Sequence, residues 1–269
     1  MRAQSGTRCD ATLFDERAEI GPDTNWFWDP LRCQHVARYL LARSWLARSQ
    51  IIDLGCGSGH GSALLARDQS CSVVGLDVAP GAVVAASRAW REPNLSFRVG
   101  DALHLDFRAG SVDTVVAFES IEHVSDPTTF LDEIRRVLRP GGRLLLSTPD
   151  RRYYSPGAGV GESHNPFHPS EMTRSELIDL LRPRFRILAE YGQEPAARDS
   201  SLARPRSPLL KDSINLLKDS IKKLTNPFLG RGLLAEALVP MLRSRHYPQL
   251  AGADGHVYLM MVCELDSPH

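Results

Sequence analysis

This chain of 269 residues has no net charge, no long apolar run and no paired cysteines, and each absence argues against a class of protein. Acidic and basic side chains balance at 32 each, so no overall field favours nucleic acid or anionic lipid. No apolar run approaches the roughly 18 residues of a membrane-spanning helix, and the start, MRAQSGTRCD, lacks an apolar signal core. The sequence therefore predicts a cytoplasmic protein with no nucleic-acid partner and no integral membrane association.

Paired cysteines are the third scarcity. The five cysteines are scattered, odd in number and free of CxxC spacing; they are Cys9, Cys33, Cys56, Cys71 and Cys263. This usage fits reduced thiols in a cytoplasm and argues against a disulfide framework or a cysteine zinc site. Cys56 lies inside a glycine-rich turn, where packing is the favoured interpretation over a reactive thiol.

What the chain does contain is a regular alternation of strand and helix patterns. With 42% hydrophobic and 24% charged residues it can bury a sizeable core. Short apolar runs rich in branched residues alternate with helical periods, as in βα units with a mainly parallel sheet. The predicted strands cover 50–55, 71–77, 95–101, 112–118, 142–149, 185–192 and 256–265. The expected fold class is α/β, a doubly wound sheet of seven strands.

Two regions fall outside this alternation and define the expected domains. Residues 1–49 are predicted to form a helical lid or flank, and residues 50–192 with 256–265 the core. Residues 193–255 are expected to form a helical insertion before the last strand, since such connections are usually far shorter. A heptad stripe runs from Leu210 to Leu224. Packing on the core is its favoured role, a substrate cover or a homodimer contact are alternatives, and a membrane surface is the least favoured.

The stretch IIDLGCGSGHG, residues 51–61, places an acid and alternating glycines after a strand. A glycine turn of this kind usually cradles phosphate. However, acids lie at the ends of three predicted strands, namely Asp53, Asp77 and Asp101, and Glu119 follows a fourth. The carboxyl ends of the strands are where doubly wound sheets bind ligands, and carboxylates in series are costly there without a cation. The pattern therefore favours a cationic, hydrogen-bond-donating ligand.

A nicotinamide dinucleotide is the main competing ligand. Asp77 lies at the spacing at which an acid binds the ribose of such a cofactor. However, the fingerprint GxGxxG fails from Gly55, because its sixth position is His60, and from Gly57, where Ser62 stands. Asp53 would also face a diphosphate. A dehydrogenase is therefore ranked below a protein that binds a positively charged nucleoside.

Five motifs occur in the order found in a known family. They are IIDLGCGSGHG, VVGLDVAPGAV, VGDALHLDF, VDTVVAFESIEHVSDP and LRPGGRLLLSTPD. Over residues 35–192 the chain resembles the class I S-adenosylmethionine-dependent methyltransferases, in particular the methyltransferase type 11 group. The segments HVARY, FESIEHV, YYSP, HNPFHPSE and YGQ resemble bacterial members from polysaccharide or natural-product pathways. The resemblance implies a Rossmann-like sheet, mostly parallel with an antiparallel last strand.

The resemblance also implies which residues bind S-adenosyl-L-methionine as cofactor. Asp77, followed by Val78, would accept the ribose hydroxyls. Asp101 would accept from the adenine amino group while Ala102 donates its N–H to the ring. Glu119 would lie beside the methionine part. The remaining expected contacts shape the methionine and ribose side or bind its carboxylate: Asp53, Gly55, Gly57, Gly59 and Arg38.

Two clusters are candidates for the chemistry on the acceptor. His123 with Glu122, in ESIEHV, is the first candidate for a general base, and loop fastening is its structural alternative. The segment HNPFHPSE supplies a second set, in which His168 is a further candidate base. A metal role for that set is disfavoured because prolines interrupt its helical spacing, so no metal is expected. The expected substrate-binding residues are Tyr153, Tyr154, His164 and Glu171.

These features predict a methyltransferase that acts on a hydroxyl of a small molecule or sugar in a biosynthetic pathway. An N-methyltransferase acting on an amine of a natural product is the alternative within enzymes. A non-catalytic scaffold protein that binds S-adenosylmethionine is the alternative from another class. The sequence names neither the acceptor nor the oligomeric state.

Overall fold

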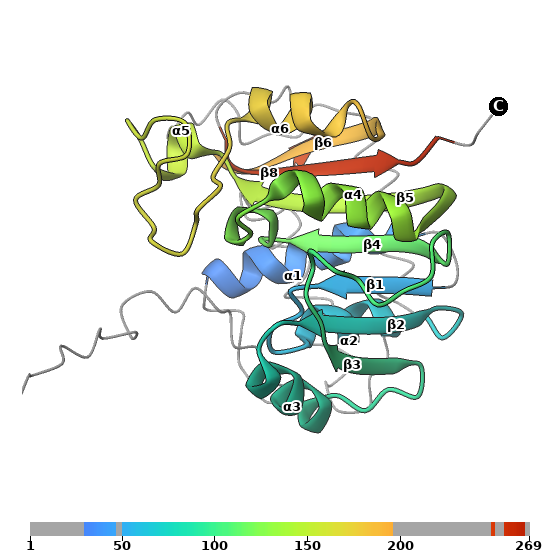
Figure 1. Ribbon diagram of the computed structural model, residues 1–269. Helices are drawn as coiled ribbons and strands as arrows, with labels where there is room; N and C mark the ends of the chain where they lie inside the picture. The colour runs from blue at the N-terminus through green and yellow to red at the C-terminus, as the bar shows by residue number, and fades with distance from the viewer. Residues whose placement is uncertain (1–29, 47–49, 196–248, 251–255, 267–269) are drawn as a thin grey trace, which may run out of the picture.

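The computed structural model describes residues 30–46, 50–195, 249–250 and 256–266 of the chain (Figure 1). One sheet of eight strands runs through the described part, in the order β3-β2-β1-β4-β5-β8-β6-β7. The strands are β1 (Gln50–Leu54), β2 (Ser72–Asp77), β3 (Leu95–Val99), β4 (Val112–Phe118), β5 (Leu138–Pro149), β6 (Arg186–Pro195), β7 (Gln249–Leu250) and β8 (His256–Glu264).

The strand order reverses between β1 and β4. Strands β1 to β5 pair in parallel, whereas β8 pairs antiparallel with both β5 and β6. The arrows of β1 and β4 accordingly point the opposite way to that of β8 in Figure 1. From β1 the chain continues to β2 and β3 on one side of the sheet, and it then returns to β4 on the other side of β1. The carboxyl ends of β1 and β4 therefore form the switch point where such sheets bind ligands.

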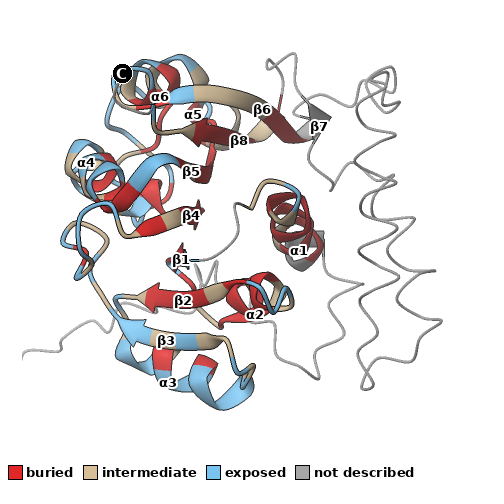
Figure 2. Ribbon diagram, turned by 90° about the vertical axis from the view of Figure 1, so that its right-hand side faces the viewer, coloured by how far each residue is buried: buried red, intermediate tan, exposed pale blue. Residues whose placement is uncertain are grey.

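Helices cover both faces of the sheet (Figure 2). On one face lie α1 (Pro30–Arg43) and α2 (His60–Ala66); on the other lie α4 (Pro127–Val137) and α6 (Arg174–Leu181). Helix α3 (Pro80–Ala89) packs against β2 and β3. The central strands are buried on both sides, and β4 reads as a nearly continuous apolar run for that reason. Two hydrophobic clusters result, one on each face.

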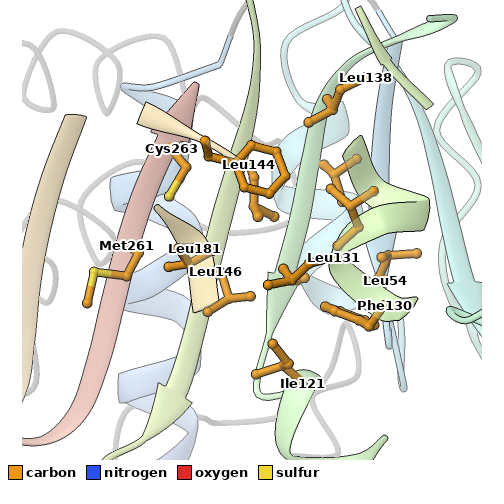
Figure 3. Packing of buried hydrophobic residues seen from close by; sticks show 14 of the residues in the cluster. Leu54, Ile121, Phe130, Leu131, Leu138, Leu144, Leu146, Leu181, Met261 and Cys263 are labelled. Carbon is orange, nitrogen blue, oxygen red and sulfur yellow. The ribbon is translucent and has the colours of Figure 1, made fainter. Parts of the chain in front are cut away.

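Helix α4 shows how the sequence sets these elements. Asp126 caps its N-terminus by accepting from the N–H groups of Thr128 and Thr129, and Pro127 occupies its first turn. Phe130 and Leu131 face the strands beside Leu54 (Figure 3). This helix therefore anchors the turn that precedes it, the 3₁₀ turn η3 (Ile121–His123), close to the end of β4.

The predicted α/β class and the seven predicted strands with an antiparallel last strand are confirmed. An eighth strand, the two-residue β7, was not predicted. Strand β5 begins at Leu138, directly after α4 ends at Val137 and four residues earlier than expected, because RPGG forms a register shift between the β4 pairings of Leu138 and Arg143. No helix in the described ranges is long and apolar enough to cross a membrane.

The predicted domain boundaries stay predictions. Helix α1 occupies part of the expected N-terminal flank, and most of the 193–255 insertion, with the heptad stripe from Leu210 to Leu224, lies outside the described residues. Strand β6 extends to Pro195 and β7 begins at Gln249, so the described ends of that segment belong to the sheet.

Candidate functional site

The glycine turn joins β1 to α2 at the switch point. Gly55, Gly57 and Gly59 all have positive φ angles, of 68°, 51° and 79°. At Gly59 a Cβ atom would also lie 2.7 Å from the Phe97 ring, so this position excludes any side chain. A Cβ at Gly57 would meet nothing within 4 Å. The turn therefore exposes bare backbone on the side where a ligand would approach.

Asp53 lies beneath this turn and has no exposed surface. Its two oxygens accept from the Tyr39 hydroxyl at 2.9 Å and from the Ser62 hydroxyl at 2.6 Å. Burial raises the pKa of Asp53 to about 7, against the opposing effect of these two hydrogen bonds. The geometry thus gives Asp53 a supporting position that ties α1 and α2 to β1.

Asp77, at the end of β2, holds the turn from the other side. Its Oδ2 accepts from the Gly57 N–H at 2.9 Å and its Oδ1 from the Ala79 N–H at 2.8 Å. Val78 beside it is 73% exposed. A carboxylate has about four acceptor sites, so Asp77 keeps capacity for further donors such as a diol.

Asp101 follows β3 in an exposed turn. Its Oδ1 accepts from the Leu103 N–H at 2.8 Å, and its side chain is 56% exposed beside His104. Ala102 next to it is half-buried. Asp77 and Asp101 follow neighbouring parallel strands, so the two carboxylates lie at the same edge of the sheet.

Glu119, directly after β4, combines a strained backbone with a buried ion pair. Its φ of 49° is in the left-handed region, which a side chain other than glycine rarely adopts. Its Oε1 accepts from the Ser147 hydroxyl at 2.6 Å and lies 3.3 Å from Nη1 of Arg38. The strain therefore serves to hold a carboxylate at the switch point.

Arg38 reaches this edge from α1 and is 1% exposed. Its Nε donates to Gln193 at 2.7 Å, and its guanidinium lies 4.7 Å from the centroid of the Tyr258 ring. Its Nη1 and Nη2 have no hydrogen-bond acceptor among the described residues. A buried cation with unused donors is costly unless a further anion binds.

Glu122, in η3, is almost fully buried. Its Oε2 accepts from the Thr148 hydroxyl at 2.9 Å, and its Oε1 has no partner among the described residues. Burial and then the nearby Glu119 raise the pKa of Glu122 well above its usual range. The carboxyl group of Glu122 thus lies three residues after that of Glu119 and is the more buried of the two.

Two histidines lie beside Glu122. The exposed His123 has its Nδ1 atom 2.9 Å from the carbonyl of Phe167. The buried His168 has its Nδ1 atom 2.7 Å from Oε1 of Glu171 and its Nε2 atom 3.2 Å from Nδ2 of Asn165. The ring centroids of the two histidines are 4.7 Å apart. The structure therefore brings together the three residues that the sequence names as candidates for catalysis.

The expected substrate-binding residues are only partly grouped around these histidines. The Tyr154 ring, from α5 (Arg151–Tyr154), lies 5.4 Å from that of His168. Glu171 is buried and accepts from His168 and from the Ser163 hydroxyl, which is a supporting position. The Tyr153 ring lies 5.2 Å from the Arg152 guanidinium, and the His164 N–H donates to Ser155.

The loop that carries His168 is hydrogen-bonded to η3 near its end, and its middle part is mostly exposed. The Ser170 hydroxyl lies 2.9 Å from the Ile121 carbonyl and 2.8 Å from the Val124 carbonyl. Between α5 and His168 the chain contains Gly157 and Gly161, both with positive φ angles. The hydrogen bonds of Ser170 therefore hold the part of the loop that carries His168, and they do not involve the preceding glycine segment.

Several residues that shape the site were missed by the sequence interpretation. Tyr39 and Ser62 hold Asp53, Thr148 holds Glu122, and Gln193 and Tyr258 contact Arg38. Tyr39 and Gln193 lie in the segments HVARY and YGQ, so those segments carried a signal. Tyr258 had none, because only the strand order places β8 beside β5.

Part of the chain is similar to a known protein family. A family model described as a methyltransferase domain matches residues 52–146, from the middle of β1 into β5. The match includes the glycine turn, Asp53 before it, and Asp77, Asp101 and Glu119 after it. Residues 52–146 are therefore similar to that family. The matched stretch carries the switch point and η3, so it includes Glu119, Glu122 and His123 but not His168.

Relatives match beyond the family model. A probable S-adenosylmethionine-dependent methyltransferase of Mycolicibacterium smegmatis is 40% identical over 169 residues, which is 63% of this chain and 63% of the relative. A ubiquinone biosynthesis O-methyltransferase of Xanthomonas oryzae pv. oryzae is 36% identical over 138 residues, covering 47% of this chain and 57% of that protein. The chain thus matches about three fifths of the length of these relatives.

Solved structures share the fold. A putative methyltransferase in complex with the Trm112 methyltransferase activator of Haloferax volcanii superimposes with a TM-score of 0.58. The two are 22% identical, and the superposition covers 87% of this chain and 90% of the other. This likeness supports the methyltransferase fold.

Proposed function

We propose that the chain is a methyltransferase that binds S-adenosyl-L-methionine at the carboxyl ends of β1 to β4 and methylates a hydroxyl group of a small molecule or sugar. The observation that carries the proposal is the buried pair of Arg38 and Glu119. Its unused guanidinium donors and its carboxylate lie side by side, as a zwitterionic amino acid requires. The methionine part of the cofactor has a carboxylate for Arg38 and an ammonium group for Glu119.

The nucleoside part fits the neighbouring acids. Asp77 has free acceptor sites for a ribose diol, and Asp101 is exposed to accept from an amino group. The bare backbone at Gly57 permits close approach, whereas the Asp77 carboxylate beside it makes the same place unfavourable for a diphosphate. These contacts support a cationic nucleoside over a dinucleotide.

The cluster of Glu122, His123 and His168 lies on the acceptor side. When bound, S-adenosylmethionine supplies an electrophilic methyl group on sulfur, and a thioether leaves as the acceptor oxygen attacks. Since the Phe167 carbonyl can only accept, neutral His123 carries its proton on Nδ1 and presents the lone pair of Nε2. His123 is exposed, so it is the member of the cluster best placed to take the proton of an acceptor hydroxyl.

Hydroxyl methylation is favoured over amine methylation by the relatives. The Xanthomonas oryzae relative is named as an O-methyltransferase. An amine acceptor would need the same proton removal, so the cluster alone does not separate the two. Product analysis does: the transferred label is found in an ether or ester for oxygen and in a methylamine for nitrogen.

Cofactor binding tests the first half of the proposal. Titration calorimetry should detect S-adenosylhomocysteine but not NAD, and Asp77→Ala should abolish that binding. Asp106→Ala, which removes an exposed carboxylate nearby, is the matched control and should bind normally. Binding of NAD alone, or full affinity in Asp77→Ala, would refute the cofactor assignment.

The acceptor half is tested by labelled methyl transfer from S-adenosylmethionine to hydroxylated metabolites and sugars. Once an acceptor is found, His123→Ala should lower kcat by 10²- to 10⁴-fold, the usual contribution of acid–base catalysis, and leave cofactor affinity nearly intact. A full rate in His123→Ala would remove His123 from the chemistry. Intact cofactor binding without transfer to any acceptor would favour the scaffold alternative.

A further inference from the structure

One carboxylate and two imidazoles converge at the end of β4. One potential ligand atom from each of Glu122, His123 and His168 lies within 4.8 Å of the others. They come from two segments far apart in the sequence, the turn η3 and the loop before α6. Ligand atoms of a tetrahedral site with bonds of about 2.1 Å are roughly 3.4 Å apart. Only a small inward movement is therefore needed, and the exposed His123 is free to make it.

The hydrogen bonds of His168 fix which of its nitrogens is bare. Oδ1 of Asn165 accepts from the Phe167 N–H at 3.0 Å, so the amide turns its Nδ2 donor toward Nε2 of His168. Nε2 is therefore an acceptor, and Nδ1 carries the proton that Glu171 accepts at 2.7 Å. A carboxylate behind the distal nitrogen is the usual support of a metal-binding histidine.

His123 has the same arrangement. Its Nδ1 proton is donated to the Phe167 carbonyl at 2.9 Å, so its Nε2 atom also carries a lone pair. A backbone carbonyl in this position is the other common support of a histidine ligand. Both imidazoles thus have the tautomer that binds metals through Nε2, and each is held in it by a different part of the protein. At His168 a metal ion would replace the Asn165 N–H that now uses this lone pair.

Glu122 supplies an independent observation. Its side chain is 1% exposed, and its Oε1 has no hydrogen-bond partner among the described residues, while Oε2 is held by Thr148. A buried carboxylate oxygen without a donor is costly. The carboxylate of Glu122 lies near the imidazoles of His123 and His168, so these three side chains together offer acceptors and no positive charge.

We propose that Glu122, His123 and His168 bind a divalent transition-metal cation. Two imidazole nitrogens and one carboxylate suit ions such as Mn²⁺, Fe²⁺ or Zn²⁺ better than Mg²⁺, which prefers oxygen ligands. Thr148, Glu171 and the Phe167 carbonyl would form the supporting shell. This proposal departs from the expectation, drawn from the sequence, that no metal is bound. The sequence pointed to His164, His168 and Glu171 as a set, whereas the fold replaces two of these three.

The inference rests on the proposed function for its chemical meaning. Three protein ligands leave coordination positions for an acceptor oxygen. A cation there would lower the pKa of a bound hydroxyl, and the proton would pass to solvent while the oxygen attacks the methyl group. His123 then acts as a ligand, and its role as a base belongs to the metal-free protein.

Mn²⁺ binding is the direct test, because the electron paramagnetic resonance signal of the free ion disappears when the ion binds. The full chain, stripped with a chelator, should bind one Mn²⁺. The affinity should fall at least 10-fold in His123→Ala and in Glu122→Gln, in keeping with the loss of a metal ligand. His104→Ala, which removes an exposed histidine elsewhere, should bind Mn²⁺ like the wild type.

Three outcomes separate this inference from the proposed function. Mn²⁺ binding that is lost in both variants supports the site whether or not S-adenosylhomocysteine binds. No Mn²⁺ binding, or equal binding in His123→Ala and Glu122→Gln, overturns the metal site and leaves the cofactor proposal standing if S-adenosylhomocysteine still binds. Because His123 is exposed, its alanine variant should fold, and circular dichroism checks this.

Discussion

At the scale of single residues, the site depends on carboxylates placed in different degrees of burial. Asp101 is exposed, Asp77 holds the glycine turn, and Asp53 and Glu122 have almost no exposed surface. Both oxygens of the buried Asp53 accept from protein hydroxyls, whereas Asp77 and Asp101 keep acceptor sites for a ligand and one oxygen of the buried Glu122 has no partner among the described residues. Hydrogen-bond partners, more than residue type, therefore divide the acids between support and binding.

Asp53 gives a prediction for stability against pH. Burial raises its pKa from 3.8 to about 7, so between those values the folded state holds a proton that the unfolded state has lost. Stability from this group is therefore fully present below about pH 4, falls as the pH rises toward 7, and is flat above it. The contribution is on the order of a few kcal/mol.

Urea denaturation of the ligand-free protein at several pH values measures this dependence. In Asp53→Asn, which cannot ionise and keeps the shape of the side chain, the fall in unfolding free energy between pH 4 and 7 should be smaller than in the wild type. Equal slopes in the two proteins would show that Asp53 titrates normally in the folded state.

At the scale of elements, the glycine turn is fixed by close packing as well as by its φ angles. Gly59→Ala should lower the unfolding free energy by about 1–3 kcal/mol, because the φ of 79° is strained for alanine and Cβ would clash with Phe97 and Ala86. Gly81→Ala is the matched control. It lies in α3 with nothing within 4 Å of the added Cβ, so it should be neutral or stabilising by up to about 1 kcal/mol.

Urea denaturation again provides the measurement. A Gly59→Ala protein as stable as wild type would mean that the turn adopts another conformation in solution. A destabilised Gly81→Ala protein would show that the difference between the two glycines does not come from the local contacts described.

The elements themselves were largely predictable from the sequence, because periodicity and caps are local. Asp126 and Pro127 mark the start of α4, and branched residues mark the buried strands. Less local features were missed. RPGG, which follows the end of α4, lies within β5 as an irregularity opposite β4, and the two-residue β7 has too short a pattern to stand out.

The site was predictable to the extent that its residues follow strands. The acids among the last residues of β1 and β2 and after β3 and β4 must lie at one edge once the sheet is parallel, so their grouping at the candidate site was predictable. The partners could not. Arg38 meets Tyr258 and His123 meets Phe167 through pairings across the fold, and no spacing in the sequence encodes those contacts.

At the scale of the whole molecule, α1 belongs to the helical layer that covers one face of the sheet. Leu40 of α1 and Leu131 of α4 are buried on opposite faces of the sheet. Leu40→Ala and Leu131→Ala should each cost about 2–5 kcal/mol of unfolding free energy, as is usual for buried leucines. Chemical denaturation followed by circular dichroism measures both, with the exposed Val84→Ala as control. A neutral Leu40→Ala would instead indicate a detachable flank.

The fastening of the His168 loop by Ser170 has a consequence for how this protein could diversify. Reactive groups stay in place because the hydroxyl of Ser170 joins them to η3, whereas the glycine segment upstream carries none of them. Residues can be inserted or exchanged in that segment without moving His168 or η3. Under the proposed function, a different acceptor would then be accommodated by loop grafting alone.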